Sequence, residues 1–246
     1  MHRLLDAHMH FNLSSADPVM DLLAQLDSVK ASGCVLILNS DDEEGVFLRN
    51  KPQLLDNNYN IFTSTLINLQ TSKKEELPYV KIHPRLTGLT RDDIPKMMSL
   101  VDNCGARVIT IDCFVYGHFL SNDIGVELGI ELAKRFCEKK IVLAHAGGVR
   151  LLECIMQTKT LQNIFYDLSL TLNYLWHSSI QQDMILLLKY HNNRVLFGSD
   201  YPSFKLVEAE TNMEKLCSKA RLSCSEANML YYENALRLYE KGGEMS

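Results

Sequence analysis

Two histidines one residue apart end a short apolar run near the N-terminus. In LLDAHMH, from Leu4 to His10, a β-strand would point His8 and His10 to one face and Ala7 and Met9 to the other. Two imidazoles on one face can chelate a metal ion. Because a lone His-x-His pair also occurs as ordinary polar residues near a core, the pair predicts a metal site only if other strands supply further ligands.

Polar side chains also end later apolar runs. The run KIHPR places Lys81 and His83 on one face and continues to Arg85. A later run, LAHAGG, supplies His145, and FGSDYP supplies Asp200. Neutral imidazoles with one hard carboxylate suit zinc or a similar divalent ion and leave a position open for water or substrate. These residue types predict one divalent ion, most simply zinc, if the fold brings the strand ends to one rim.

Short runs rich in Val, Ile and Leu recur between longer segments with helical spacing, which is typical of successive βα units. In 246 residues, eight strands each followed by a helix predict a closed (β/α)₈ TIM barrel, whose catalytic groups lie where the strands end. An open doubly wound sheet is the alternative, but no Gly-rich phosphate-binding turn follows the first run. The runs lie near 3–9, 34–39, 61–67, 79–83, 107–113, 141–145, 164–169 and 194–199.

The connecting segments carry helix signals. In the first of them Asp17 can cap a helix, Pro18 fits its first turn and Gly33 can end it. The stretch 71–78 is too short to predict a helix, and the chain has no repeat or Pro/Gly/Ser-rich linker, so we expect a single domain over 1–246. Further helices are predicted over 91–105, 126–139, 181–191 and 225–241.

Composition excludes several classes of protein. With 46% hydrophobic and 22% charged residues the chain is an ordinary globular protein, and no apolar run is long enough to cross a membrane. A net charge of −5 without a basic cluster argues against a nucleic-acid partner. Seven scattered cysteines without a C-x-x-C pair, and no leader sequence, predict reduced thiols in the cytoplasm. The expected partner is a small-molecule substrate, and homo-oligomerisation is left open.

The motifs together resemble the amidohydrolase-related metal-dependent hydrolase superfamily. D-x-H-x-H opens the chain, followed by K-x-H-P, AHAGG, FGSDYP and a closing ENALRLY. The resemblance spans Asp6 to Tyr239 and is nearest to the branch with aminocarboxymuconate-semialdehyde decarboxylase and pyrone-dicarboxylate lactonase. It implies that His8 and His10 bind metal and that Asp200 binds metal and takes a proton from the nucleophilic water. His145 matches a histidine that is a metal ligand in some branches and an acid/base or oxyanion stabiliser in others.

The fifth strand departs from the family pattern. The family usually ends this strand with a histidine, whereas VITIDCFVYGH supplies Asp112 and Cys113. Asp112 could ligate the metal instead, or His118 could reach in from the loop. If neither does, the site is one ligand short.

Other polar residues at strand ends have two interpretations each. Lys81 matches a lysine that is carbamylated to bridge two metals in binuclear members, or an unmodified charge partner in the K-x-H-P branch. His83 and Arg85 are placed to bind a substrate carboxylate or phosphate, or to pair with local acids at the rim. Asp167 and Ser169 could position substrate or support a metal ligand.

The sequence predicts a metal-dependent hydrolase acting on an amide, ester or lactone of a small anionic molecule through a metal-activated water. A non-oxidative decarboxylase on the same scaffold is one alternative, and a degenerate barrel with a binding role is another. A TatD-like deoxyribonuclease shares the His-x-His strand, but it places a glutamate where this chain has KIHP. The net negative charge of the chain also argues against a nuclease.

Overall fold

The computed structural model describes residues 3–71, 77–121 and 123–240. Within these residues, eight strands form one parallel sheet in sequence order, from β1 beside β2 to β7 beside β8. All eight coincide with the predicted apolar runs. They are β1 (Leu5–Met9), β2 (Gly33–Leu38), β3 (Asn60–Leu66), β4 (Tyr79–Ile82), β5 (Val108–Asp112), β6 (Lys140–Ala144), β7 (Ile164–Asp167) and β8 (Val195–Leu196).

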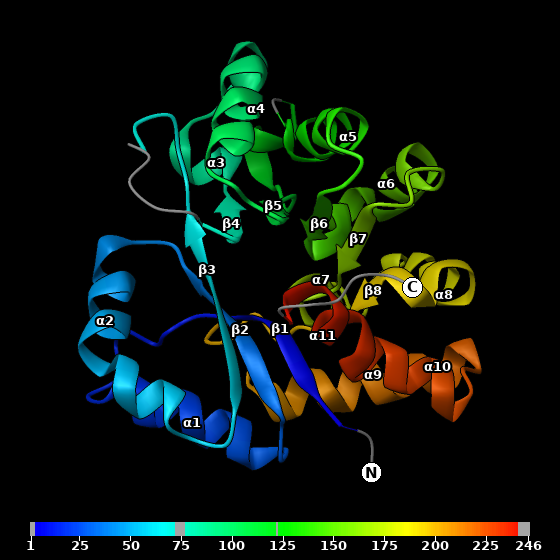
Figure 1. Cartoon of the computed structure of the whole chain (residues 1–246). Helices are drawn as coiled ribbons and strands as arrows, with labels where there is room; N and C mark the ends of the chain where they lie inside the picture. Colours follow the sequence, from blue (N-terminus) through cyan, green and yellow to red (C-terminus); the bar gives the residue numbers. More distant parts are fainter. Residues whose placement is uncertain (1–2, 72–76, 122, 241–246) are drawn as a thin grey trace.

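Backbone hydrogen bonds join the last strand to the first. The N–H of Ala7 donates to O of Phe197 at 2.8 Å, and the N–H of Asp200 donates to O of His8 at 2.9 Å. The sheet therefore curls into a (β/α)₈ barrel, as predicted, with helices arranged around it (Figure 1). The ends of β1 and β8, which carry the predicted ligands, become neighbours through these bonds.

The helices cover the outside of the barrel and one of its ends. Within the described ranges, no helix combines the length and the hydropathy needed to cross a membrane. The helices are α1 (Pro18–Ser28), α2 (Asp41–Leu55), α3 (Pro84–Thr87), α4 (Ile94–Asn103), α5 (Gly125–Arg135), α6 (Leu151–Thr158), α7 (Thr171–Tyr174), α8 (Ile180–His191), α9 (Leu206–Ala220), α10 (Cys224–Asn228) and α11 (Asn234–Tyr239).

The first helix starts as predicted but ends differently. Asp17 caps α1 by accepting the N–H of Met20 at 3.0 Å. The helix stops at Ser28, and Lys30 rather than Gly33 takes up a left-handed conformation, with φ of 54°. Gly33 begins β2 instead. This position requires glycine, because a Cβ there would lie only 2.0 Å from the carbonyl oxygen of Asn60 on β3.

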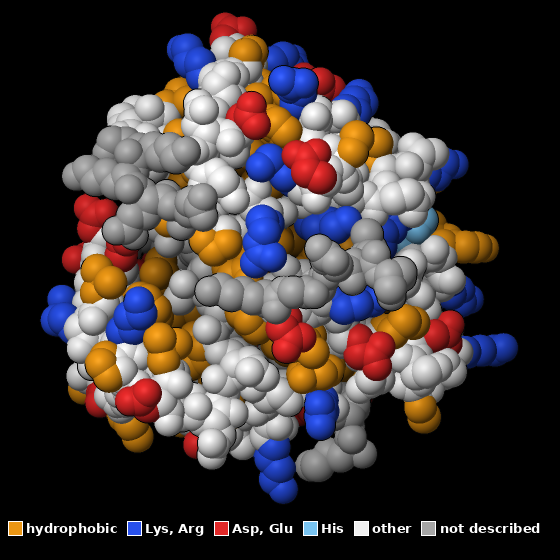
Figure 2. All heavy atoms as spheres, in the orientation of Figure 1, with side chains coloured by type: hydrophobic (Ala, Val, Ile, Leu, Met, Phe, Trp, Pro, Cys, Tyr) orange, Lys and Arg blue, Asp and Glu red, His pale blue; other side chains and the backbone are white. Residues whose placement is uncertain are grey.

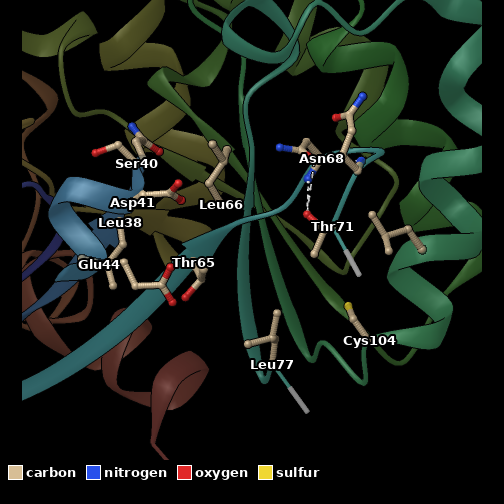
Figure 3. A pocket seen from close by; sticks show the side chains of 13 residues that line it. Leu38, Ser40, Asp41, Glu44, Thr65, Leu66, Asn68, Thr71, Leu77 and Cys104 are labelled. Carbon is tan, nitrogen blue, oxygen red and sulfur yellow. Dashed lines mark hydrogen bonds between the residues drawn. The ribbon is translucent and has the colours of Figure 1, made fainter. Parts of the chain in front are cut away.

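The connection between β3 and β4 lies beside a cavity on the outside of the barrel. Residues 72–76, in the stretch predicted to be too short for a helix, lie outside the described residues, and the described part of this connection contains no helix. A cavity of about 860 Å³ lies here between α2 and α4, with Leu38, Leu66 and Leu77 among its lining residues (Figure 3). It is therefore separate from the barrel interior.

Apolar side chains from the strands fill the barrel interior, and α11 closes its N-terminal end. The hydroxyl of Tyr79 donates to O of Tyr239, which fastens α11 to the start of β4. Figure 2 shows this closed face, where lysine and arginine side chains are interspersed with aspartate and glutamate. The predicted site residues lie at the opposite, C-terminal end of the strands. The interior cluster comprises Leu5, Ala7, Val35, Ile37, Tyr79, Val108, Val142, Leu196, Ala235, Leu238 and Tyr239.

Candidate metal centre

The end of β1 is irregular, and this irregularity directs His8. The register with β2 shifts between Asp6 and Met9, as in a β-bulge. Oδ1 of Asp6 supports the bulge by accepting the N–H groups of His8 at 2.9 Å and Ser199 at 3.1 Å. Ala7 packs in the barrel interior, whereas Met9 packs with the cluster that includes the helices. The prediction that Ala7 and Met9 share a face is therefore wrong, because strict alternation does not survive a bulge.

Two other site residues adopt left-handed backbone conformations at strand ends. His145 follows β6 and Asp200 follows β8, each with φ of 61°. This conformation costs about 1–2 kcal/mol per residue, although Asp and His tolerate it better than most residues. Gly198 allows close approach of the chain after β8, since a Cβ there would lie 2.8 Å from Oδ1 of Asp167 and 3.0 Å from Cβ of His8. Both turns bring their side chains to the end of β1.

His8, His145 and Asp200 meet at the C-terminal rim of the barrel. Nε2 of His8 lies 3.5 Å from Oδ1 of Asp200, and Nε2 of His145 lies 4.0 Å from the same oxygen. One ligand atom from each residue lies within 4.8 Å of the other two, and all three residues are buried. Atoms that bind one zinc ion at about 2.0–2.2 Å lie at most about 4 Å apart. The group therefore fits a metal ion after a small contraction.

Both imidazoles are held through the nitrogen that faces away from this group. Nδ1 of His8 lies 2.5 Å from Oδ2 of Asp167, and Nδ1 of His145 donates to O of Ser169 at 3.0 Å. These acceptors fix the proton on Nδ1 and leave Nε2 to bind a metal. Nε2 of His8 is buried and has no hydrogen-bond partner among the described residues. Such an atom is costly to bury, and a bound cation would satisfy it.

The surroundings of His8 and Asp167 favour a neutral His8 imidazole and an ionised Asp167 carboxylate. Burial lowers the pKa of His8 to about 4. Burial acts to raise the pKa of Asp167, but the adjacent His8 ring outweighs it and lowers that pKa to about 2. At neutral pH a neutral imidazole therefore donates to a carboxylate, which is the protonation state that a metal ligand needs. Of the two interpretations of Asp167, support of a ligand matches these contacts.

Asp112 ends β5 and faces three nitrogen-bearing side chains. Its Oδ2 lies 3.1 Å from Nε2 of His145, 3.5 Å from Nε2 of His83 and 3.7 Å from Nζ of Lys81. Burial acts to raise the pKa of Asp112, but His145 and Lys81 hold it well below its usual range. Burial acts to lower the pKa of His145, yet Asp112 raises it above the usual value. Without a metal, Asp112 therefore favours the protonated form of the His145 ring.

Two predicted ligands lie beside the three-residue group. In the part of the chain that the structure describes, the group of atoms within 4.8 Å of one another includes neither His10 nor Asp112. The ring centroid of His10 lies 5.3 Å from that of His8, and its Nδ1 donates to O of Ile37 at 3.0 Å. Asp112 reaches the group through its contact with His145. Metal ligation by His10 and Asp112 stays a prediction.

Two predicted substrate-binding residues line a cavity beside the site. This cavity of about 190 Å³ is bounded by Asp112, Arg85, His118 and Phe119, among others. The guanidinium of Arg85 lies 5.0 Å from the ring centroid of Tyr116 and 5.8 Å from that of Phe119. Its Nε is buried and lacks a hydrogen-bond partner within the described ranges. The two rings thus hold a cation at the edge of the cavity. Lys81 and His83 face Asp112 from the neighbouring strand.

Glu43 is a buried carboxylate near the site that the sequence analysis does not identify. Its Oε1 lies 3.5 Å from Nδ1 of His10, and its Oε2 accepts the N–H of Asn39 at 2.7 Å. The hydroxyl of Ser40 accepts the N–H of Glu43 at 3.3 Å and so caps the start of α2. The Ser-x-x-Glu spacing could have predicted the helix start, but not the contact with β1.

Solved structures share this fold at low sequence identity. An amidohydrolase from Burkholderia multivorans with bound zinc has a TM-score of 0.66 and 17% identity over 96% of this chain and 99% of that chain. A TIM-barrel protein from Bordetella bronchiseptica has a TM-score of 0.71 and 12% identity over 96% and 98%. Dihydroorotase from Saccharomyces cerevisiae, in complex with 5-fluoroorotic acid, has a TM-score of 0.68 and 11% identity over 97% and 84%.

The sequence comparison identifies the family. No curated protein matches the chain in sequence. The amidohydrolase family model matches residues 77–241, which is more than half of the chain and includes Lys81, Asp112, His145 and Asp200. The match therefore agrees with the barrel and with its buried group of two histidines and an aspartate. The chain belongs to the amidohydrolase family and is an enzyme of the metal-dependent hydrolase superfamily.

Proposed function

We propose that the chain is a hydrolase that uses one divalent ion, zinc, held by His8, His145 and Asp200. His10, whose ring lies beside that of His8, would be a further ligand. The observation that carries this proposal is the buried Nε2 of His8, which has no hydrogen-bond partner in the described residues and lies 3.5 Å from Oδ1 of Asp200. Asp167 fixes the ring from behind. The zinc found in the Burkholderia amidohydrolase supports the choice of metal.

The chemistry follows from the residues around this position. A divalent ion bound here supplies a Lewis acid that polarises a carbonyl group and makes water a stronger acid. Asp200 faces both imidazoles and is placed to accept a proton from the attacking water. Lys81 lies close to Asp112 and adds positive potential where negative charge develops on the substrate oxygen.

The cavity beside Asp112 supports a small anionic substrate. Its volume of about 190 Å³ is below the roughly 300–1,000 Å³ typical of sites for drug-sized ligands. Arg85 lines this cavity, and a guanidinium pairs well with a carboxylate or phosphate. We therefore propose an amide, ester or lactone that carries an anionic group.

Product analysis with zinc-loaded protein tests this function. The assay uses a panel of small carboxylated lactones, esters and amides, each beside its neutral analogue. We expect hydrolysis of an anionic member, loss of turnover on chelation and recovery on adding zinc. Release of CO₂ without hydrolysis would instead identify the decarboxylase. Zinc-loaded, folded protein that turns over no member of the panel would favour a binding role.

A further inference from the structure

We propose that Glu43 is a positioning residue that orients His10 toward the metal, an inference that rests on the proposed metal site. Glu43 is only 6% exposed. The ion pairs of the described residues join it to His10 and to no lysine or arginine. Burying a carboxylate without a basic partner is unfavourable. Its place against the His10 imidazole therefore favours a role in positioning that ring.

The contacts of His10 explain what Glu43 does. Nδ1 of His10 faces two acceptors, O of Ile37 at 3.0 Å and Oε1 of Glu43 at 3.5 Å. The hydrogen bond to O of Ile37 places the proton on Nδ1, the nearby carboxylate of Glu43 favours the same tautomer, and Nε2 is left as the nitrogen for a metal. A carboxylate behind a ligating histidine also strengthens electron donation by its other nitrogen. Asp167 lies behind the His8 ring at a shorter distance of 2.5 Å, so His8 and His10 each have a carboxylate behind the ring.

The start of α2 fixes the Glu43 carboxylate in this position. Oε2 accepts the N–H of Asn39 at 2.7 Å, and the hydroxyl of Ser40 lies 3.5 Å from the same oxygen. A negative charge in the first turn of a helix is favourable because the helix dipole is positive there. The helix end therefore offsets part of the burial penalty and keeps the side chain against β1.

Other acidic residues at the start of α2 face away from the site. Asp41 and Glu44 line the outer cavity between α2 and α4, as Figure 3 shows. Glu44→Gln removes the same charge from the same helix turn without touching His10. It is therefore a matched control for Glu43→Gln, which keeps the shape of the side chain and an oxygen for Asn39 but removes the carboxylate.

Zinc affinity, measured by competition with a chromophoric chelator, tests the proposal. We expect Glu43→Gln to bind zinc about 10–100-fold more weakly than wild type, and Glu44→Gln to bind it as wild type does. With cobalt(II) in place of zinc, the visible absorption spectrum should change in Glu43→Gln and not in Glu44→Gln. Glu43→Asp, which withdraws the carboxylate from His10 by one methylene group, should also weaken zinc binding and gives a second variant if Glu43→Gln does not fold.

A double-mutant cycle with His10→Ala separates positioning from general destabilisation. If Glu43 acts through His10, Glu43→Gln should weaken zinc binding no further in the His10→Ala background. Wild-type affinity in both Glu43 variants would overturn the inference, as would an undiminished loss in the His10→Ala background. Wild-type protein that binds no zinc would overturn the metal site as well, so the two failures are distinguishable.

Discussion

Nε2 of His145 lies 3.1 Å from Oδ2 of Asp112, so one buried nitrogen takes part in an ion pair and also faces the proposed metal position. Burial acts to lower the pKa of His145, but Asp112 outweighs it and raises that pKa above the usual value. A proton and a metal therefore compete for this nitrogen. The competition extends to higher pH than it would for an ordinary imidazole.

We predict that zinc affinity increases with pH until His145 loses its proton. Below its pKa each bound zinc displaces this proton, so the Kd should fall about tenfold per unit of increasing pH and then level off. Zinc titrations from about pH 5.5 to 8 would measure this. Asp112→Asn should move the plateau to lower pH, because it removes the carboxylate that raises the pKa. An unchanged Kd across the range would contradict the competition.

Asp167→Asn should weaken zinc binding while leaving the fold in place. The variant removes the carboxylate that fixes Nδ1 of His8, and loss of such a partner typically weakens metal affinity about 10–100-fold. Chelator competition measures the affinity, and circular dichroism checks the fold. Asp183→Asn on α8 is the control, since Asp183 lies outside the metal group. Equal zinc affinity in Asp167→Asn and wild type would show that the contact does not support the ligand.

Asp112→Ala should destabilise the folded protein strongly. It leaves the buried ammonium of Lys81, which is 1% exposed and 3.7 Å from Asp112, without this carboxylate. Breaking a buried pair in this way costs about 3–5 kcal/mol of unfolding free energy. Adding Lys81→Met should recover part of the loss, because no unpaired charge then remains buried. Chemical denaturation checks both variants, and a double variant no more stable than Asp112→Ala would argue against the pairing.

Arg85→Gln should raise the KM for an anionic substrate of the proposed reaction by about tenfold or more, since hydrogen bonds to charged groups contribute about 1.5–3 kcal/mol. The kcat should change little, because Arg85 lies beside the ligands rather than among them. Steady-state kinetics on the anionic substrate and its neutral analogue test this. Arg91→Gln is the control, because Arg91 pairs with Glu127 at 2.7 Å on the surface. An equal effect on both substrates would exclude an anion-binding role.

The sequence predicts the strands that carry most of the site residues, but fewer of the contacts between their side chains. Strand-end positions such as His145 and Asp200 follow from short apolar runs, because parallel strands end on the same rim. The bulge that separates Ala7 from Met9 depends on the closing bonds from β8, which lie far along the chain. The contact of Glu43 with His10 depends in the same way on where α2 begins after β2, the strand beside β1. Local patterns carry no information on such long-range contacts.

The metal content of the purified chain tests the central proposal most directly. Protein loaded with zinc and then dialysed should contain about one ion per chain by elemental analysis, as expected of a single catalytic zinc site. The double variant His8→Ala/Asp200→Asn, shown to be folded by circular dichroism, should contain almost none. Folded wild-type protein that retains no zinc, or a double variant that retains as much as wild type, would contradict a metal centre at His8, His145 and Asp200.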